Sequence, residues 1–322
     1  MQISGNRFLV TGGAGLIGSH IVDQLLAKDA GKIIILDNML RGSQENIAAA
    51  LKDSRVEFIE GDICDQALVR SLLERVDGLF HMAALRIKHC IQEPRLAMDV
   101  MFNAPMNMLL SAAELGIKRV VSASSSSIYG QATVFPTNED HHPYDDITLY
   151  GAGKLAAEGA MRALRATHGF SYATPRFFNV YGPRMDIHGL YTEVMVRWME
   201  RIEAGQPPLI FGDGSDSMDF TNVSDAARFC VMAMENDSHS GAYNVGTGIT
   251  TSLSDLCKLL VKVMDGKVQP EFKPADSQNA VRYRLCGTEK SQREIGFKAE
   301  ISLEQGLREL VSWWRNQKKV SA

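Results

Sequence analysis

Short apolar runs and longer amphipathic segments alternate from the start of the chain to about position 180. The apolar runs are rich in β-branched residues and continuous rather than alternating, which is typical of strands buried on both faces of a parallel sheet. Six strands are predicted, at residues 8–12, 32–38, 55–62, 78–83, 119–125 and 171–179. Helical spacing of apolar residues predicts helices between most of them, at residues 18–30, 67–76, 97–116 and 149–169. This alternation predicts an α/β fold: a Rossmann-type, doubly wound parallel sheet with right-handed crossovers.

The second half of the chain lacks this regular alternation. Helical patterns at residues 194–205, 224–236, 252–264 and 302–317 are mixed with short strand-like stretches and loops. We therefore expect a Rossmann domain over residues 1–180, to which residues of about 215–248 return, and a smaller mixed α/β substrate domain over mainly residues 181–322. No repeat, low-complexity tract or flexible linker separates the halves, so they should pack together.

Composition narrows the class of protein. The 322 residues are 45% hydrophobic and carry a net charge of −4, which provides no basic field for nucleic acid or for an anionic membrane. The five cysteines form no CxxC pair, and adjacent histidines such as His141 and His142 rarely converge on one ion, so neither a disulfide framework nor a metal site is expected. The sequence shows no signal core and no apolar run of membrane-spanning length, from which we expect a cytoplasmic protein.

A glycine-rich stretch, TGGAGLIG, links the first predicted strand to the first helix. Glycines at Gly12, Gly15 and Gly18 permit a tight turn, close approach of a phosphate and close packing of helix on strand. The N–H groups at the start of the helix, from Leu16 and Ile17 onward, suit a pyrophosphate. This stretch predicts a dinucleotide-binding loop.

An acidic residue closes the second predicted strand. Asp37, beside Asn38, follows the last glycine of the loop, Gly18, at the spacing where an acid binds the ribose hydroxyls of a dinucleotide. A carboxylate there repels a 2′-phosphate, which favours NAD, while Arg41 leaves NADP open. Later strand ends add further cofactor-binding candidates, namely Asp62, Ile63, Ala83 and Ala84.

Residues suited to oxidising an alcohol follow the fifth predicted strand. The run SASSSSIYG ends that strand, and Tyr150 and Lys154 lie one helical turn apart on one face of the next helix. A nearby ammonium and a positive nicotinamide should lower the pKa of the tyrosine phenol, so that it can act as a base near pH 7. A serine hydroxyl from the strand end can hydrogen-bond the substrate hydroxyl. This set predicts proton removal from an alcohol whose hydride NAD accepts.

The motifs TGGAGLIG, SSSSIYG, YGAGK and RFFNVYGPR together resemble the extended short-chain dehydrogenase/reductases. Within that group they resemble the NAD-dependent nucleotide-sugar epimerases and dehydratases, of the UDP-glucose 4-epimerase type. The resemblance implies that Tyr150 is the catalytic base, Lys154 its partner and Ser125 the catalytic hydroxyl, with Ser126 beside it. It implies that Asn179 contacts the diphosphate of a nucleotide-sugar substrate. It also implies tightly bound NAD and a homodimer formed through a helix bundle.

The serine run also bears on the reaction. Dehydratases of the family carry Thr-Asp-Glu before the VYG-like segment, where this chain has Ser125, Ser126 and Ser127. The missing acids disfavour dehydration. A 4-epimerase needs only oxidation at C4, rotation of the keto sugar and hydride return, so it is the expected activity. Another nucleotide-sugar-modifying enzyme (a decarboxylase, dehydratase or reductase) and a non-catalytic NAD-binding scaffold are the alternatives.

The substrate side departs from the resemblance. Met218 stands where many members have a diphosphate-binding arginine, and KPADSQNAVRYR lacks a second one. Arg282 is the expected replacement, and Arg86 is a further candidate for binding substrate. Arg284 could instead meet a carboxylate, which leaves a uronic acid nucleotide open. The base and the sugar of the substrate are therefore left open.

Overall fold

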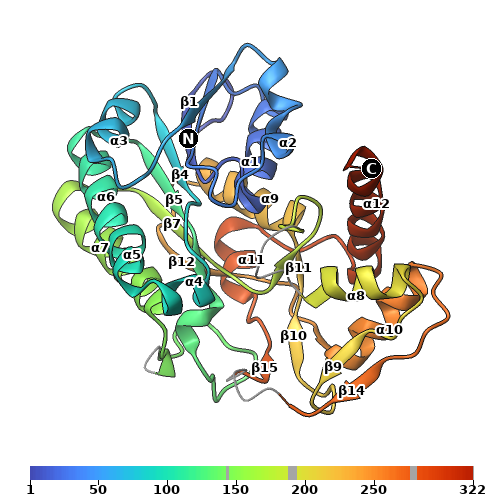
Figure 1. The fold of residues 1–322 in the computed structure, drawn as a ribbon. Helices are drawn as coiled ribbons and strands as arrows, with labels where there is room; N and C mark the ends of the chain where they lie inside the picture. The colour runs from blue at the N-terminus through green and yellow to red at the C-terminus, as the bar shows by residue number, and fades with distance from the viewer. Residues whose placement is uncertain (143–144, 188–193, 276–280, 322) are drawn as a thin grey trace.

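A parallel sheet forms the centre of the molecule (Figure 1). The computed structural model describes residues 1–142, 145–187, 194–275 and 281–321. Neighbouring strands run in the order β12-β7-β5-β4-β1-β2-β3, every pair is parallel, and the short β6 also pairs with β7. The expected doubly wound α/β fold is confirmed. The strands are β1 (Arg7–Thr11), β2 (Lys32–Asp37), β3 (Val56–Glu60), β4 (Gly78–His81), β5 (Arg119–Ser122), β6 (Ser124–Ser125), β7 (Tyr172–Phe177) and β12 (Gly241–Val245).

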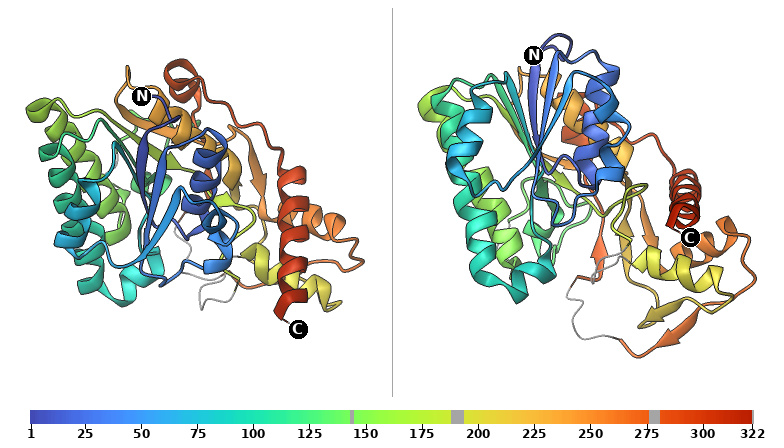
Figure 2. Two further views of the ribbon diagram at one scale, coloured as in Figure 1. Left: turned by 90° about the horizontal axis from the view of Figure 1, so that it is seen from above. Right: turned by 45° about the horizontal axis from the view of Figure 1, so that its top comes forward.

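Helices cover both faces of this sheet, as Figure 2 shows. Phe8 and Val10 pack into the core on one face and Leu9 into the core on the other, which explains why the strands read as unbroken apolar runs. The first face carries α1 (Leu16–Ala27), α2 (Gln44–Ile47), α9 (Val223–Glu235) and α11 (Glu289–Ile295). The second carries α3 (Gln66–Leu73), α4 (Ile87–Gln92), α5 (Pro94–Met98), α6 (Ala104–Glu114) and α7 (Leu149–His168).

Three short segments depart from regular α-helix, and one of them shapes the site. The helix expected over residues 97–116 contains a π-helical turn (Asp99–Asn103) between α5 and α6. A 3₁₀ turn, η3 (Ser126–Tyr129), follows β6, and a second one, η1 (Ala50–Lys52), precedes β3. The turn after β6 carries the serine run away from the sheet and toward the cleft described below.

Most of the second half of the chain forms a smaller part beside the sheet (Figure 1). Its core packs Trp198, Leu260 and Trp314 together. Its helices are α8 (Val194–Glu203), α10 (Leu253–Val263) and α12 (Leu303–Ser321). In the residues that the structure describes, its strands form three small sheets: β8 (Val180–Tyr181) with β11 (Thr221–Asn222), β9 (Leu209–Phe211) with β14 (Glu271–Lys273), and β10 (Ser217–Asp219) with β13 (Thr250–Ser252) and β15 (Tyr283–Arg284).

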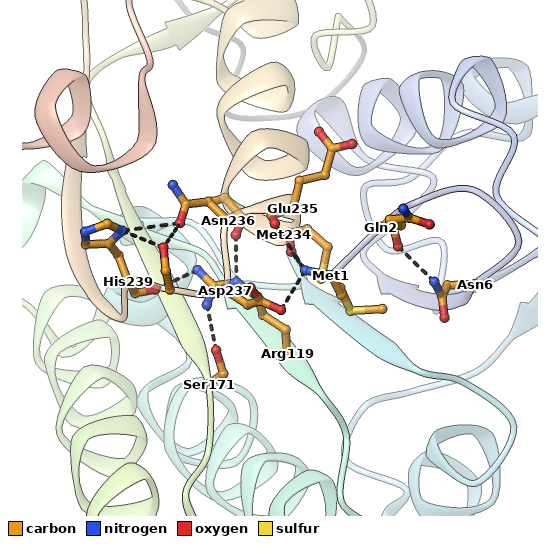
Figure 3. Close-up of polar contacts among 12 residues, drawn as sticks. Met1, Gln2, Asn6, Arg119, Ser171, Met234, Glu235, Asn236, Asp237 and His239 are labelled. Carbon is orange, nitrogen blue, oxygen red and sulfur yellow. Dashed lines mark hydrogen bonds and ion pairs between the residues drawn. The ribbon is translucent and has the colours of Figure 1, made fainter.

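The helix α9 and the strand β12 return to the large sheet, and a buried arginine bonds α9 and the loop between α9 and β12 (Figure 3). Arg119 on β5 is fully buried, and its guanidinium donates to the carbonyl oxygen of Ala233 (2.6 Å), to Ser171 Oγ (2.7 Å) and to the carbonyl oxygen of His239 (3.0 Å). Burial lowers the pKa of Arg119 to about 10. Three acceptors compensate the buried charge, as a buried cation requires. The boundary between the two domains, expected near residue 180 from the sequence, stays a prediction.

Within the described part of the chain, no helix combines the length and the apolar character needed to cross a membrane.

Candidate active site

A cleft of about 2140 Å³ follows the carboxyl ends of the parallel strands. In this fold that edge of the sheet is where ligands bind. One wall consists of the glycine loop, the ends of β2 to β6 and the start of α7, and the other includes α8, β10 and β15. The structure brings to this cleft nearly all the residues predicted to bind or react: Gly12, Gly15, Leu16, Ile17, Gly18, Asp37, Asn38, Asp62, Ile63, Ala83, Ala84, Arg86, Ser125, Ser126, Tyr150, Lys154 and Asn179.

The glycine loop is packed too closely to hold side chains. Gly12 has a φ of +65°, and a Cβ placed on it would lie 2.7 Å from the backbone nitrogen of Ala83. A Cβ on Gly18 would overlap the carbonyl oxygen of Gly12. The helix α1 begins after Gly15 without a side-chain cap, so the N–H groups of its first turn suit an anion. The loop therefore has the shape and polarity of a pyrophosphate cradle.

Asp37 is fixed at the end of β2 by two backbone groups. Its carboxylate is 8% exposed and accepts hydrogen bonds from the backbone N–H groups of Ala14 and Met39, each at 3.0 Å. Burial raises the pKa of Asp37, while these two bonds oppose the rise. Beside it, the Asn38 side chain donates to the Asp62 carboxylate at 2.8 Å. These contacts hold three polar side chains in place at the ends of β2 and β3.

Tyr150 and Lys154 lie on one face of α7, close to the serine run. The helix is capped by Thr148, whose Oγ1 accepts from the backbone N–H of Gly151 at 3.0 Å. The Lys154 Nζ lies 5.9 Å from the centre of the Tyr150 ring. The Ser125 hydroxyl lies close enough to the Tyr150 phenol to lower its pKa, and the Ser125 Oγ also accepts from the backbone N–H of Ser127 at 3.1 Å. The Ser, Tyr and Lys side chains therefore meet at one end of the cleft.

Burial dominates the electrostatics of this group. It lowers the pKa of Lys154, a side chain only 5% exposed, to about 8. Burial also raises the pKa of Tyr150, against the nearby Ser125 hydroxyl and the positive charges of Arg41 and Arg284, which lower it. From the sequence, Lys154 and a bound nicotinamide together were expected to lower the pKa of the tyrosine. In the protein alone, desolvation of the phenolate outweighs the groups that lower this pKa. A further positive charge beside the phenol is needed to lower it.

A buried ion pair joins the helix of Tyr150 to β7, and a hydrogen bond extends it to β6, the strand of the serine run. Glu158, one turn beyond Lys154, accepts from Arg176 at 3.0 and 2.7 Å and from Ser124 Oγ at 2.6 Å. Arg176 also donates to the Tyr129 hydroxyl at 2.7 Å. Sequence reasoning missed this network. Two features of the sequence could have indicated it: an acidic residue, Glu158, four positions after Lys154, and Arg176 at the start of RFFNVYGPR.

The substrate side differs from the expectation in one residue. Arg282 is exposed and is not among the residues that line the cleft, whereas Arg284 lines it. Arg284 lies on β15, which pairs with β10 so that Arg284 is the register partner of Met218. Asn179 donates from its side chain to the carbonyl oxygen of Asp219 at 3.2 Å. The Arg86 guanidinium lies 3.9 Å from the Asp186 carboxylate.

Residues 8–246 match the family model described as the NAD dependent epimerase/dehydratase family. The chain belongs to this family. It is 33% identical over 314 residues to the UDP-glucose 4-epimerase of Mycolicibacterium smegmatis, covering 97% of this chain and 99% of that protein. It is also 30% identical to UDP-glucuronic acid decarboxylase 1 of Arabidopsis thaliana, over 97% of this chain and 70% of that protein. A crystal structure of the UDP-glucose 4-epimerase of Thermotoga maritima with UDP-glucose superposes with a TM-score of 0.89 at 30% identity, covering 97% and 99% of the two chains.

The protein is thus an enzyme of an NAD-dependent family, and the cleft fits that cofactor. The glycine loop, which admits no Cβ at Gly12 or Gly18, would hold the pyrophosphate. Asp37 would bind the ribose hydroxyls. Ligand pockets typically measure about 300–1,000 Å³, so a cleft of about 2140 Å³ has room for a dinucleotide and a second nucleotide together.

Proposed function

We propose that this enzyme is an NAD-dependent nucleotide-sugar 4-epimerase. The observation that carries the proposal is the meeting of Ser125, Tyr150 and Lys154 in a cleft that also contains the glycine loop. The side chains that follow Ser125 on η3 are serines, so the dehydratase acids are absent from these positions. Epimerisation at C4 requires one base and one hydrogen-bonding hydroxyl, which this set supplies.

Each residue has a defined task in this reaction. Tyr150 removes the proton of the C4 hydroxyl, and the Ser125 hydroxyl hydrogen-bonds the same oxygen. The Lys154 ammonium, one helical turn away, stabilises the phenolate. Bound NAD supplies the acceptor for the C4 hydride and, after the keto sugar has turned, the donor for its return. Tyr150 then returns the proton to the C4 oxygen.

The size of the cleft supports the rotation that epimerisation needs. The sugar must present its opposite face between oxidation and reduction, while the diphosphate keeps the nucleotide bound. Met218 and Phe220, which line the cleft, offer apolar surface and no directional hydrogen bond from their side chains. Such a wall resists rotation of a hydroxyl-bearing ring less than a set of fixed donors does.

Purified protein incubated with a panel of nucleotide sugars, without added cofactor, tests the proposal. Nuclear magnetic resonance and mass spectrometry should show a product of unchanged mass with inverted C4. A product lighter by carbon dioxide would replace the proposal with a decarboxylase, as in the Arabidopsis relative. A product lighter by water would indicate a dehydratase. Bound NAD with no conversion of any sugar would indicate the scaffold.

We also propose that the enzyme is a homodimer. Met98 on α5 and Leu110 on α6 are 43% and 44% exposed, and these helices cover the second sheet face. Exposed apolar residues gathered on neighbouring helices are typical of a surface that another protein covers. Light scattering coupled to size-exclusion chromatography should give twice the mass of the 35.5 kDa chain. A single-chain mass at micromolar concentration would refute the dimer.

A further inference from the structure

Arg284 reaches from β15 to the serine run at the catalytic end of the cleft. Its Nη1 donates to Ser126 Oγ at 2.6 Å, and Ser126 is 2% exposed. Ser126 follows Ser125 directly, and the positive charge of Arg284 acts on the phenol of Tyr150. The guanidinium therefore lies beside the groups proposed to hold the C4 hydroxyl of the sugar.

The protein compensates the charge of Arg284 only in part. Over the described ranges of the chain, no ion pair joins its guanidinium to a carboxylate. Asp146 attracts it, but that carboxylate already accepts from the backbone N–H and the hydroxyl of Thr148, at 3.1 and 2.9 Å. Burial lowers the pKa of Arg284, yet an arginine keeps its proton at neutral pH. A partly buried cation on the wall of the cleft, without a carboxylate partner among the described residues, favours an anionic ligand.

A nucleotide-linked uronic acid carries two kinds of anionic group, the diphosphate and a carboxylate, and their positions on the ring differ. The diphosphate is attached at C1, across the pyranose ring from C4. A carboxylate at C5 is attached to the carbon next to C4. A cation next to the residues that hold the C4 hydroxyl can therefore reach a C5 carboxylate, whereas the diphosphate points away from it. The planar guanidinium is suited to a two-point contact with a carboxylate.

We propose that Arg284, oriented by Ser126, binds a carboxylate at C5 of the sugar, so that the preferred substrate is a nucleotide-linked uronic acid. This inference rests on the proposed function, because it takes Ser125 and Tyr150 as the groups that hold the C4 hydroxyl. It assigns to β15 a role in selecting the sugar. Ser126 acts as a positioning residue, since it contacts the guanidinium rather than the reacting atoms.

Binding measurements on NAD-loaded protein test this proposal without relying on turnover. The Tyr150→Phe background prevents reaction, and calorimetry gives the Kd for matched glucose and glucuronate pairs on UDP, dTDP and GDP. At least one glucuronate nucleotide should bind more tightly than its glucose partner. Arg284→Met should weaken that binding by about 30-fold or more, and leave the glucose partner within about 3-fold. Arg284→Lys should weaken binding of the glucuronate nucleotide by an intermediate factor, since lysine keeps the positive charge but lacks the two-point contact of the guanidinium.

A charge-matched control separates local from general effects. Arg293→Gln on α11 removes a cation whose side chain is 66% exposed and paired with Glu294, outside the cleft, and should leave both affinities unchanged. Melting curves show whether the Arg284 variants fold. If Arg284→Met weakens glucose and glucuronate nucleotides equally, the arginine serves the diphosphate or the fold, and the proposal is wrong. It is also wrong if no glucuronate nucleotide binds, or if none is preferred.

The proposed epimerase can fail independently of this inference. If wild-type protein converts a uronate nucleotide with loss of carbon dioxide, the reaction is not epimerisation. The preference for the carboxylate and its dependence on Arg284 would nevertheless stand. Conversely, inversion at C4 of neutral sugars alone would retain the epimerase and overturn the role of Arg284.

Discussion

Neutralising the Glu158 carboxylate should destabilise the protein far more than neutralising a surface carboxylate with the same ion-pair distance. The Arg176–Glu158 pair is 2.7 Å long, and its side chains are 8% and 1% exposed. The Arg70–Glu114 pair is also 2.7 Å long, but its side chains are 45% and 42% exposed. The two pairs therefore differ mainly in burial. Replacement of each glutamate by glutamine preserves the shape and removes the charge.

The magnitude follows from the state of the arginine that remains. Glu158→Gln leaves the guanidinium of Arg176 charged and buried, which costs about 3–5 kcal/mol when one partner of a buried pair is lost. Glu114→Gln leaves Arg70 in water, and exposed pairs contribute about 0–1 kcal/mol. At about 2.1 cal/mol/K per residue, the unfolding entropy of the 322-residue chain is roughly 0.7 kcal/mol/K, so 3 kcal/mol lowers the melting temperature by about 4 °C.

Calorimetric melting and guanidinium denaturation of both variants provide the assay. The free energy of unfolding should fall by about 3 kcal/mol or more for Glu158→Gln and by less than about 1 kcal/mol for Glu114→Gln. The double replacement Glu158→Leu with Arg176→Met should recover most of the loss, because it removes both buried charges. Equal losses in the two single variants would refute the reasoning, since burial would then not determine the contribution of the pair.

Three further predictions concern the reaction and its cofactor. Tyr150→Phe should lower kcat by about 10²-fold or more and leave the NAD Kd unchanged, in a calorimetric titration beside the kinetic assay; near-normal kcat would exclude Tyr150 as the base. Asp37→Ala should weaken NAD by about 10-fold or more with little change for the nucleotide sugar, and equal weakening would contradict its ribose role. Lys154→Met should abolish turnover yet raise the melting temperature at pH 7. Burial lowers the folded pKa of Lys154 to about 8 from 10.5, so folding carries a cost of roughly 3 kcal/mol below pH 8. That cost falls as the pH rises from 8 to 10.5, because over this range Lys154 is protonated in the unfolded chain and neutral in the folded one. The stability gained by Lys154→Met should therefore decrease over the same range. A gain that does not change with pH would contradict the shifted pKa.

The sequence was informative wherever structure depends on near neighbours. Continuous apolar runs located the six strands expected in the first half of the chain, because strands between two layers of helices bury both faces. The glycine loop and the Tyr150–Lys154 pair also follow from short spacings, since a tight turn and one helical turn are both local geometries. These features were sufficient to predict the sheet, the tight glycine loop and the helix that carries Tyr150 and Lys154.

What depends on distant segments was decided only by the tertiary structure. Arg284 rather than Arg282 lines the cleft because β15 pairs with β10, and that register joins two strands that lie far apart in the chain. The Glu158–Arg176 pair forms where α7 packs against β7, so neither side chain could be assigned a partner from its own surroundings. The raised pKa of Tyr150 has the same origin. The sequence spacing places Lys154 near the phenol of Tyr150. Desolvation of that phenol, however, depends on how many other segments pack around it, which only the folded chain determines.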